Sequence, residues 1–174
     1  MKNLLFIILS QDYNEEMFLY FENFLLQHSI VLHIAEVKND FTIEDAFNAL
    51  CLKQDYVYFF GHADLEGVGD DANQILYDWK HISETACLHG YFNDNCTLLL
   101  HCCLGGNIKI TEQITKSCNK FSTIIGTVNK HNDADLILVL SNFIYLVEKA
   151  KKTPKNACEN IRNILNIELN CWSI

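Results

Sequence analysis

Proline and glycine are scarce in this chain of 174 residues, which has one proline and seven glycines. Flexible linkers and low-complexity tracts are usually rich in these residues, and no such tract or internal repeat is found. We therefore expect residues 1–174 to form a single domain. A domain of this length buries enough surface to fold without a metal or a disulfide.

Basic residues are also few. Lys and Arg number 13 against 22 Asp and Glu, which gives a net charge of −9, and Arg162 is the sole arginine. Nucleic acids and anionic membrane surfaces attract basic faces, so neither is expected as a partner. Hydrophobic residues make up 49% of the chain, a share that excludes wholesale disorder.

The sequence contains no Cys-x-x-Cys pair and no apolar run of the roughly 18 residues needed to cross a bilayer. A structural zinc site and a membrane span are therefore not expected. Eight cysteines lie mostly inside apolar runs, which indicates buried side chains in a reducing, cytoplasmic setting rather than a disulfide framework. The apolar run 4–9 is short and lacks a small-residue cleavage site, so a first strand fits better than a signal peptide.

Apolar runs of strand length alternate along the chain with segments of helical period. Strands are expected at 3–9, 30–35, 56–60, 97–101 and 123–126, with a short edge strand at 74–79. Helices are expected at 15–27, 42–52 (with a Thr42/Asp45 capping box), 83–89, 111–118, 134–149 and 156–165. This alternation predicts an α/β fold with a mostly parallel central sheet and helices on both faces. In such sheets, sites form at the carboxyl ends of the strands.

Two of these strand ends carry residues suited to thiol chemistry. His62 follows the third strand directly after a glycine, and Cys102 and Cys103 follow the fourth strand, with Gly105 and Gly106 behind them. Thiol catalysis needs a thiolate, a base beside it and backbone donors for an oxyanion. A single His or Cys is more often structural, but together at neighbouring strand ends they favour a His–Cys pair. The glycines would allow the backbone to approach a substrate closely.

The segments YFFGHAD and LLLHCCLGG, some forty residues apart, resemble the caspase-like thiol peptidases, specifically the bacterial CHAT branch related to separase. In that family one apolar strand ends in Gly-His-Gly, and the next core strand ends in a small residue, Cys, two residues and Gly. The resemblance extends in order and spacing over most of residues 3–165. It includes QILYDWKHISE between His and Cys, and FSTIIGTVNKHNDADLILVLSNFIYLVEKAKKTPKNACENIRN after them.

The resemblance implies a caspase-like three-layer sandwich with a His–Cys dyad. His62 would be the general acid/base and Cys103 the nucleophile, with Cys102 as the alternative because both cysteines fit Cys-x-x-Gly. Cys103 is preferred, since Cys102 then takes the place of the family's small residue before the nucleophile. The backbone N–H groups of Ala63 and of the nucleophile, Cys103, would hold the oxyanion. No cofactor and no metal are implied.

Two residues depart from the family pattern. Ala63 replaces the usual glycine, which keeps the amide donor but adds a methyl group that crowds the site. His101 before the two cysteines is unusual, and it fits a core histidine, a second titrating group near the thiolate, or a metal ligand with Cys102 and Cys103. The metal is least favoured because three adjacent side chains rarely reach one ion. Both departures leave open an inactive or partner-activated dyad.

Substrate selection is sought at the exit of the first strand. Asp12 lies there and fits either a pocket for a Lys or Arg side chain or a solvated loop. The net charge of −9 favours basic substrates. Arg162 lies on an expected terminal helix, which argues against an Arg-lined pocket. Loops and helix caps are the expected places of four further aspartates: Asp70, Asp71, Asp133 and Asp135.

These expectations point to a cysteine endopeptidase that cleaves protein substrates after a basic residue through a thioester acyl-enzyme. Gating by a partner protein or by oligomerisation is expected, and the resemblance implies a setting in bacterial defence. The alternative is a catalytically inactive caspase-like module that acts as a protein-binding or regulatory subunit. A doubly wound nucleotide-binding domain is disfavoured because the turn at residues 9–12 has no glycine to admit a phosphate.

Overall fold

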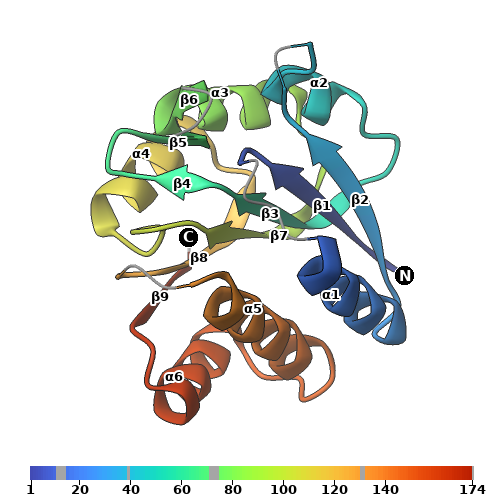
Figure 1. Ribbon diagram of the computed structural model, residues 1–174, viewed down its shortest axis with the longest axis vertical. Coiled ribbons are helices and arrows are strands. Elements are labelled where there is room, and N and C mark those ends of the chain that lie inside the picture. Colours follow the sequence, from blue (N-terminus) through green and yellow to red (C-terminus); the bar gives the residue numbers. More distant parts are fainter. Residues whose placement is uncertain (11–14, 39, 71–74, 130–131, 174) are drawn as a thin grey trace.

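A six-stranded sheet forms the middle layer of the molecule (Figure 1). The computed structural model describes residues 1–10, 15–38, 40–70, 75–129 and 132–173. The strand order is β2-β1-β3-β7-β8-β9, and every neighbouring pair is parallel except β8 and β9, which are antiparallel. The strands are β1 (Lys2–Ile8), β2 (Ile30–Glu36), β3 (Gln54–Phe60), β7 (Phe92–His101), β8 (Phe121–Thr127) and β9 (Leu169–Ser173).

Helices cover both faces of this sheet (Figure 1). One layer consists of α1 (Glu15–Gln27), α5 (Asp133–Glu148) and α6 (Pro154–Leu165). The other layer consists of α2 (Ile43–Asn48), α3 (Trp79–His89) and α4 (Ile108–Ser117). Among the described ranges, no helix is both long and apolar enough to cross a membrane.

A second, small sheet follows β3 at the carboxyl end of the main sheet. It consists of β4 (His62–Ala63), β5 (Gly67–Asp70) and β6 (Ile75–Asp78), in that order and antiparallel throughout. The candidate base His62 therefore lies in this small sheet, whereas the cysteines follow the main one.

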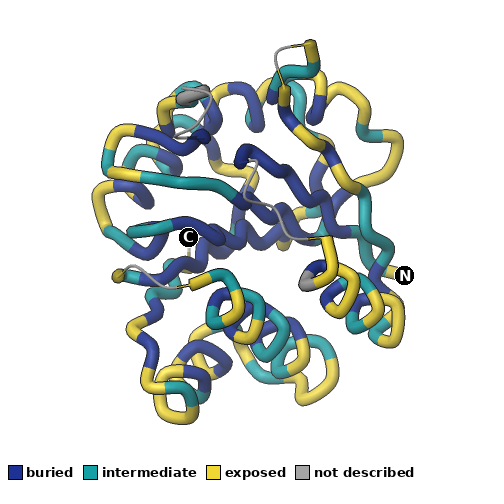
Figure 2. Tube along the Cα trace, in the orientation of Figure 1, coloured by how far each residue is buried: buried dark blue, intermediate teal, exposed yellow. Residues whose placement is uncertain are grey.

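The side chains of the central strands alternate between two cores. In β1, Leu4, Phe6 and Ile8 pack toward α1, α5 and α6, whereas Leu5 and Ile7 pack toward α2, α3 and α4. None of the five is more than 3% exposed. Figure 2 shows the buried strands in the middle and the exposed residues on the outer turns of the helices. Burial on both faces explains why the strands are apolar almost without a break.

The predicted α/β class with a mostly parallel sheet between two helical layers is confirmed. The helix expected at 15–27 has those bounds, and the capping box of Thr42 and Asp45 is present with both of its hydrogen bonds. Two features were not predicted: the antiparallel edge strand β9 and the hairpin of β4 and β5. All eight cysteines are free thiols: four are buried, three are half-buried and Cys51 is exposed, whereas most of them were expected to be buried.

Candidate functional site

His62 lies where the chain leaves the carboxyl end of β3. The parallel register of β3 and β7 runs up to Phe60 opposite His101, and the N–H of Gly61 donates to the carbonyl oxygen of His101 at 3.3 Å. His62 comes next in the chain and is half-buried. The two strand ends that carry the candidate pair are therefore hydrogen-bonded neighbours.

The hairpin that begins with His62 is held by both α3 and α4. The carboxylate of Asp64 closes its turn by accepting from two backbone N–H groups at 2.8 and 3.0 Å. Nε1 of Trp79, the fully buried first residue of α3, donates to the carbonyl oxygen of Asp64 at 3.0 Å. Gln113 of α4 donates to the carbonyl oxygen of Leu65, also at 3.0 Å. Because α4 begins just after the cysteines, Gln113 links the histidine segment to the cysteine segment.

The two adjacent cysteines have different surroundings. Cys102 is 2% exposed and packs into the core on the side of α2, α3 and α4. Burial raises the pKa of the Cys102 thiol far above its ordinary range, and the neighbouring Cys103 raises it further. Cys103 is half-buried at the start of the turn that follows.

Leu104 has a strained backbone directly after the candidate nucleophile. Its φ is 61°, in the left-handed region that branched side chains rarely adopt. Such conformations cost about 1–3 kcal/mol and persist where the surrounding structure demands them, often at active sites. No sequence signal marks a leucine with positive φ, so this feature was not predicted.

Gly106 and Gly126 have a packing role that the sequence did not indicate. The N–H of Gly106 donates to the carbonyl oxygen of Thr127 at 2.8 Å, and the carbonyl oxygen of Gly106 accepts from Asn170 Nδ2 at 2.8 Å. A Cβ on Gly106 would lie 2.8 Å from the carbonyl carbon of Gly126, and a Cβ on Gly126 would lie 2.6 Å from the oxygen of Gly105. The backbone after the cysteines is thus packed directly on β8.

His101 forms a buried hydrogen-bonded chain that sequence analysis missed. Its ring is 1% exposed; Nδ1 bonds to the hydroxyl of Tyr58, and Nε2 lies 3.3 Å from Oδ1 of Asp133. The ring packs against Phe60 on the side of α1 and α5, whereas Cys102 packs on the opposite face of the sheet. His101 and Cys102 therefore do not share an ion. Across the described ranges, no three His, Cys, Asp or Glu side chains are grouped to hold a metal.

Asp133 is the first residue of α5, and its side chain is 40% exposed. The hydrogen bond from His101 is the main cause that lowers the pKa of the Asp133 carboxyl; partial burial opposes it, and the charges of His101 and His62 lower the pKa further. The expectation that Asp133 is a loop or cap residue is wrong, because Asn132 caps α5 and accepts from the N–H of Asp135 at 2.9 Å. Asp133 instead bonds to His101, the last residue of β7, and so lies at the edge of the sheet that carries the candidate site.

Three other expected aspartates have different outcomes. Asp12 and Asp71 lie outside the described residues. Asp70 is 6% exposed within β5, so its expected loop position is wrong. Asp70 was expected in a loop because the strand that contains it, β5, was not predicted.

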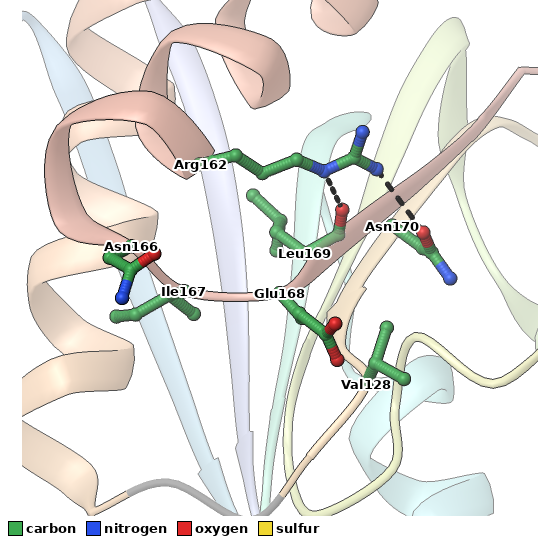
Figure 3. A pocket seen from close by; sticks show the side chains of 7 residues that line it. All are labelled: Val128, Arg162, Asn166, Ile167, Glu168, Leu169 and Asn170. Atoms are coloured by element: carbon green, nitrogen blue, oxygen red, sulfur yellow. Dashed lines mark hydrogen bonds between the residues drawn. The ribbon is translucent and has the colours of Figure 1, made fainter.

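The single arginine lines a pocket of about 420 Å³ between α6 and the start of β9 (Figure 3). Arg162 donates through Nε to the carbonyl oxygen of Leu169 and through Nη2 to Oδ1 of Asn170 at 3.1 Å. Neither His62 nor Cys103 lines this pocket. Its link to the candidate site is indirect and runs through the side chain of Asn170, which also binds the carbonyl oxygen of Gly106.

No protein-family model matches this sequence, and no curated protein matches it. The solved structures that resemble this chain include two of RgpB, which share its fold. One is the complex of the pro- and mature domains of RgpB from Porphyromonas gingivalis, with a TM-score of 0.57 and 10% identity over 93% of this chain and 43% of that chain. Another is the Arg-specific cysteine proteinase gingipain R (RgpB), with a TM-score of 0.52 and 14% identity over 88% of this chain and 38% of that one.

This chain spans about two fifths of the length of the solved chains that it matches. At 10% and 14% identity the likeness concerns the fold. The fold of this chain is that of the caspase-like gingipains, a mostly parallel sheet between helical layers.

Proposed function

We propose that this protein is a caspase-like cysteine peptidase of the CHAT type, with His62 as general acid/base and Cys103 as nucleophile. One observation carries the proposal most: the backbone hydrogen bond between Gly61 and His101 ties together the strand ends from which the pair emerges. In parallel α/β sheets this edge is where sites form. The fold shared with cysteine proteinases supports the same chemistry.

The surroundings of the two thiols favour Cys103 over Cys102 as nucleophile. Only a thiolate attacks a carbonyl carbon, and burial disfavours the thiolate of Cys102. Cys103 is half-buried and is followed by the strained Leu104, a backbone feature that is typical of active-site turns.

The proposed reaction is acyl transfer in two steps. His62 takes the proton of the Cys103 thiol, and the thiolate attacks the scissile carbonyl carbon. The N–H groups of Ala63 and Cys103 hold the oxyanion, and His62 returns the proton to the leaving amine. Water then hydrolyses the thioester with His62 as base.

The donor role of Ala63 is supported by the register of the hairpin. The N–H of Asp64 donates to the carbonyl oxygen of Gly67, so the next pair of residues, Ala63 and Val68, is not hydrogen-bonded. The N–H of Ala63 therefore points away from β5.

A basic residue before the cleaved bond is the proposed specificity. The net charge of −9 attracts cationic substrates, and the carboxylate of Asp133 bonds to His101 at the edge of the sheet that carries the proposed dyad. Asp12 remains the proposed pocket residue, on sequence grounds alone. Gating by a protein partner or by oligomerisation, a cytoplasmic setting and a role in bacterial defence belong to the same proposal through the CHAT resemblance.

The test is selective labelling of one thiol. The purified protein is treated with a peptidyl electrophile that carries Lys or Arg next to its reactive group, and the labelled cysteines are identified by mass spectrometry. Cys103 should react first, and His62→Ala should slow that reaction by about a hundredfold or more. The exposed thiol of Cys51 serves as the internal reference, because its rate should be the same in both proteins.

Two further outcomes have defined meanings. Faster labelling of Cys102 than of Cys103, with the same dependence on His62, would exchange the two cysteines in the proposal. Labelling of Cys103 at the rate of Cys51 and unaffected by His62→Ala would reject the dyad. It would instead favour the inactive module that binds a protein partner, an alternative motivated by Ala63 in place of the family's glycine.

A further inference from the structure

The hydrogen-bonded chain of Tyr58, His101 and Asp133 lies beneath the candidate site and takes no part in the proposed chemistry; its tyrosine and histidine are buried, and its aspartate is partly exposed. Tyr58 and His101 are 0% and 1% exposed, and both ring nitrogens of His101 have partners. The rings of Phe18 and Phe60 enclose the imidazole, with centroids at 6.2 and 4.9 Å. A polar network this deeply buried is costly unless every member is satisfied, so its geometry is tightly defined.

One arrangement of protons satisfies every atom of the chain. A carboxylate only accepts, so Nε2 of His101 carries the proton that is donated to Asp133. Nδ1 is then an acceptor, and the hydroxyl of Tyr58 donates to it. Burial lowers the pKa of His101 and so favours the neutral ring, although the hydrogen bond and charge of Asp133 oppose this. Burial, followed by the charges of Asp133 and Cys102, raises the pKa of Tyr58 well above its ordinary value, so its hydroxyl stays protonated.

His101 also connects the segments that carry the candidate pair. Its carbonyl oxygen accepts from Gly61, the residue directly before His62. The polypeptide continues from His101 through Cys102 to Cys103. The ring of His101 bonds to Asp133 at the start of α5, so the carboxylate lies at the edge of the sheet where His62 follows β3, and the charge of His62 contributes to lowering the pKa of that carboxyl. One buried residue is therefore bonded to both sides of the site.

We infer that His101 is a positioning residue: its ring, held by Tyr58, keeps the Asp133 carboxylate beside His62, where the carboxylate stabilises the protonated imidazole that forms when Cys103 gives up its proton. No bond to His101 forms or breaks in the reaction. This inference rests on the proposed function, because the carboxylate has this purpose only if His62 accepts that proton.

The test compares the rate of Cys103 labelling between variants of the chain. Each rate is measured from about pH 5 to about pH 9, a range that spans the ordinary histidine pKa. Tyr58→Phe/His101→Leu removes both partners of the buried bond and leaves no orphaned hydroxyl. In this double variant Cys103 should be labelled at least about tenfold more slowly than in wild type, since small displacements of catalytic groups have effects of this size. Asp133→Asn should slow labelling equally and change the pH profile in the same way. Adding Asp133→Asn to the double variant should change nothing further.

Two variants separate positioning from folding. His101→Gln keeps an amide donor near the place of Nε2 and should restore the rate to within about threefold of wild type, because the Asp133 bond is kept. Tyr56→Phe is the matched control for the tyrosine, since Tyr56 lies on the same strand and face but bonds to Glu148. In the Tyr56→Phe variant, Cys103 should be labelled at the wild-type rate. Unfolding curves verify that each variant is folded.

The two ways of failing are distinguishable. If His62→Ala slows labelling but the folded double variant keeps the wild-type rate and pH profile, the role of His101 is overturned and the dyad stands. If His62→Ala has no effect in the wild-type background, the dyad itself is wrong, and the positioning role is overturned with it.

Discussion

At the scale of single residues, two tyrosines of β3 show how one strand serves two ends of the molecule. Tyr56 and Tyr58 point to the same face, and each buried hydroxyl finds one partner. The partner of Tyr58 is His101, at the carboxyl end. The partner of Tyr56 is Glu148 at the end of α5, which also binds Nζ of Lys2 at 2.6 Å. The bond of Tyr58 lies at the end of the sheet that carries the candidate site, and the bond of Tyr56 joins α5 to the start of the sheet.

The bond between Tyr56 and Glu148 predicts a stability difference that depends on pH. Tyr56→Phe should lower the free energy of unfolding by about 2 kcal/mol at pH 7, because the hydroxyl donates to a carboxylate in a largely buried place. Burial would raise the pKa of Glu148, but hydrogen bonds from Lys2 and Tyr56 lower it overall. A lowered carboxyl pKa contributes stability above the unfolded value of about 4.3, and that contribution is lost as the pH falls through the folded pKa.

Urea unfolding of wild type and Tyr56→Phe at pH 7 and at about pH 3.5, below the ordinary glutamate pKa, measures this difference. The gap between the two proteins should narrow at the lower pH. A gap that stays constant or widens on acidification would contradict the assignment of Glu148 as the ionised partner.

The contact between Gly126 and the backbone after the cysteines predicts a steric penalty. Gly126→Ala places a methyl group against Gly105 and Gly106, so the free energy of unfolding should fall by about 3 kcal/mol. Gly61→Ala is the graded comparison, because its Cβ would lie 3.1 Å or more from its neighbours and should cost less. Thermal and chemical unfolding of both variants check the order. An equal or smaller loss at Gly126 would show that the loop moves away easily.

At the scale of elements, the antiparallel edge strand β9 is connected to the helix before it by a single cation. Arg162 of α6 binds the backbone of Leu169 and the side chain of Asn170, and Asn170 in turn binds Gly106 beyond the cysteines. Leu169 is 1% exposed, so the strand is also held by apolar packing. The helix α6 is thus linked, through the side chains of Arg162 and Asn170, to the backbone that follows the candidate nucleophile.

Removing that cation should loosen β9 more than it weakens the whole protein. Arg162→Met keeps the length of the side chain but loses both hydrogen bonds, so global stability should fall by about 1–2 kcal/mol. Amide exchange in residues 169–173 should increase while exchange in β1 and β3 stays slow. Lys155→Met, an exposed cation on the same helix, is the control and should leave β9 unchanged. Equal exchange in the two variants would show that packing alone holds the strand.

At the scale of the whole molecule, the strands of the central sheet were predictable because burial on both faces makes them continuous apolar runs. The ends of β3 and β7 were predictable for the same reason, together with the rule that sites lie at that edge. The bond between His101 and Asp133 could not be predicted, because 32 positions separate the two residues. No local pattern links a histidine in a strand to the start of a later helix. The strand β9 was missed because five residues with mixed polarity resemble a tail.

The distribution of charge at this scale predicts a dependence on salt. A groove of about 470 Å³ between α1 and β2, near the carboxyl end of β1, is lined by four glutamates, Glu15, Glu16, Glu22 and Glu36, and the net charge is −9. A cationic peptidyl electrophile should therefore label Cys103 faster than a neutral one of the same shape at low salt. The ratio of the two rates should fall as ionic strength rises from about 0.01 to about 0.1 M, which shortens the Debye length from about 30 to about 10 Å. A constant ratio would exclude steering by the acidic surface.

The contact of Gly126 with Gly105 and Gly106 also has a consequence for the gene. Every single-nucleotide change that alters a glycine codon without creating a stop codon introduces a residue with a Cβ, and the position of that atom is already occupied by backbone. Every missense mutation at position 126 should therefore destabilise the protein, although Gly126 lies in β8 and is not one of the proposed reacting residues. In a saturation library it should rank with the residues of the proposed dyad for intolerance, for reasons of volume rather than chemistry.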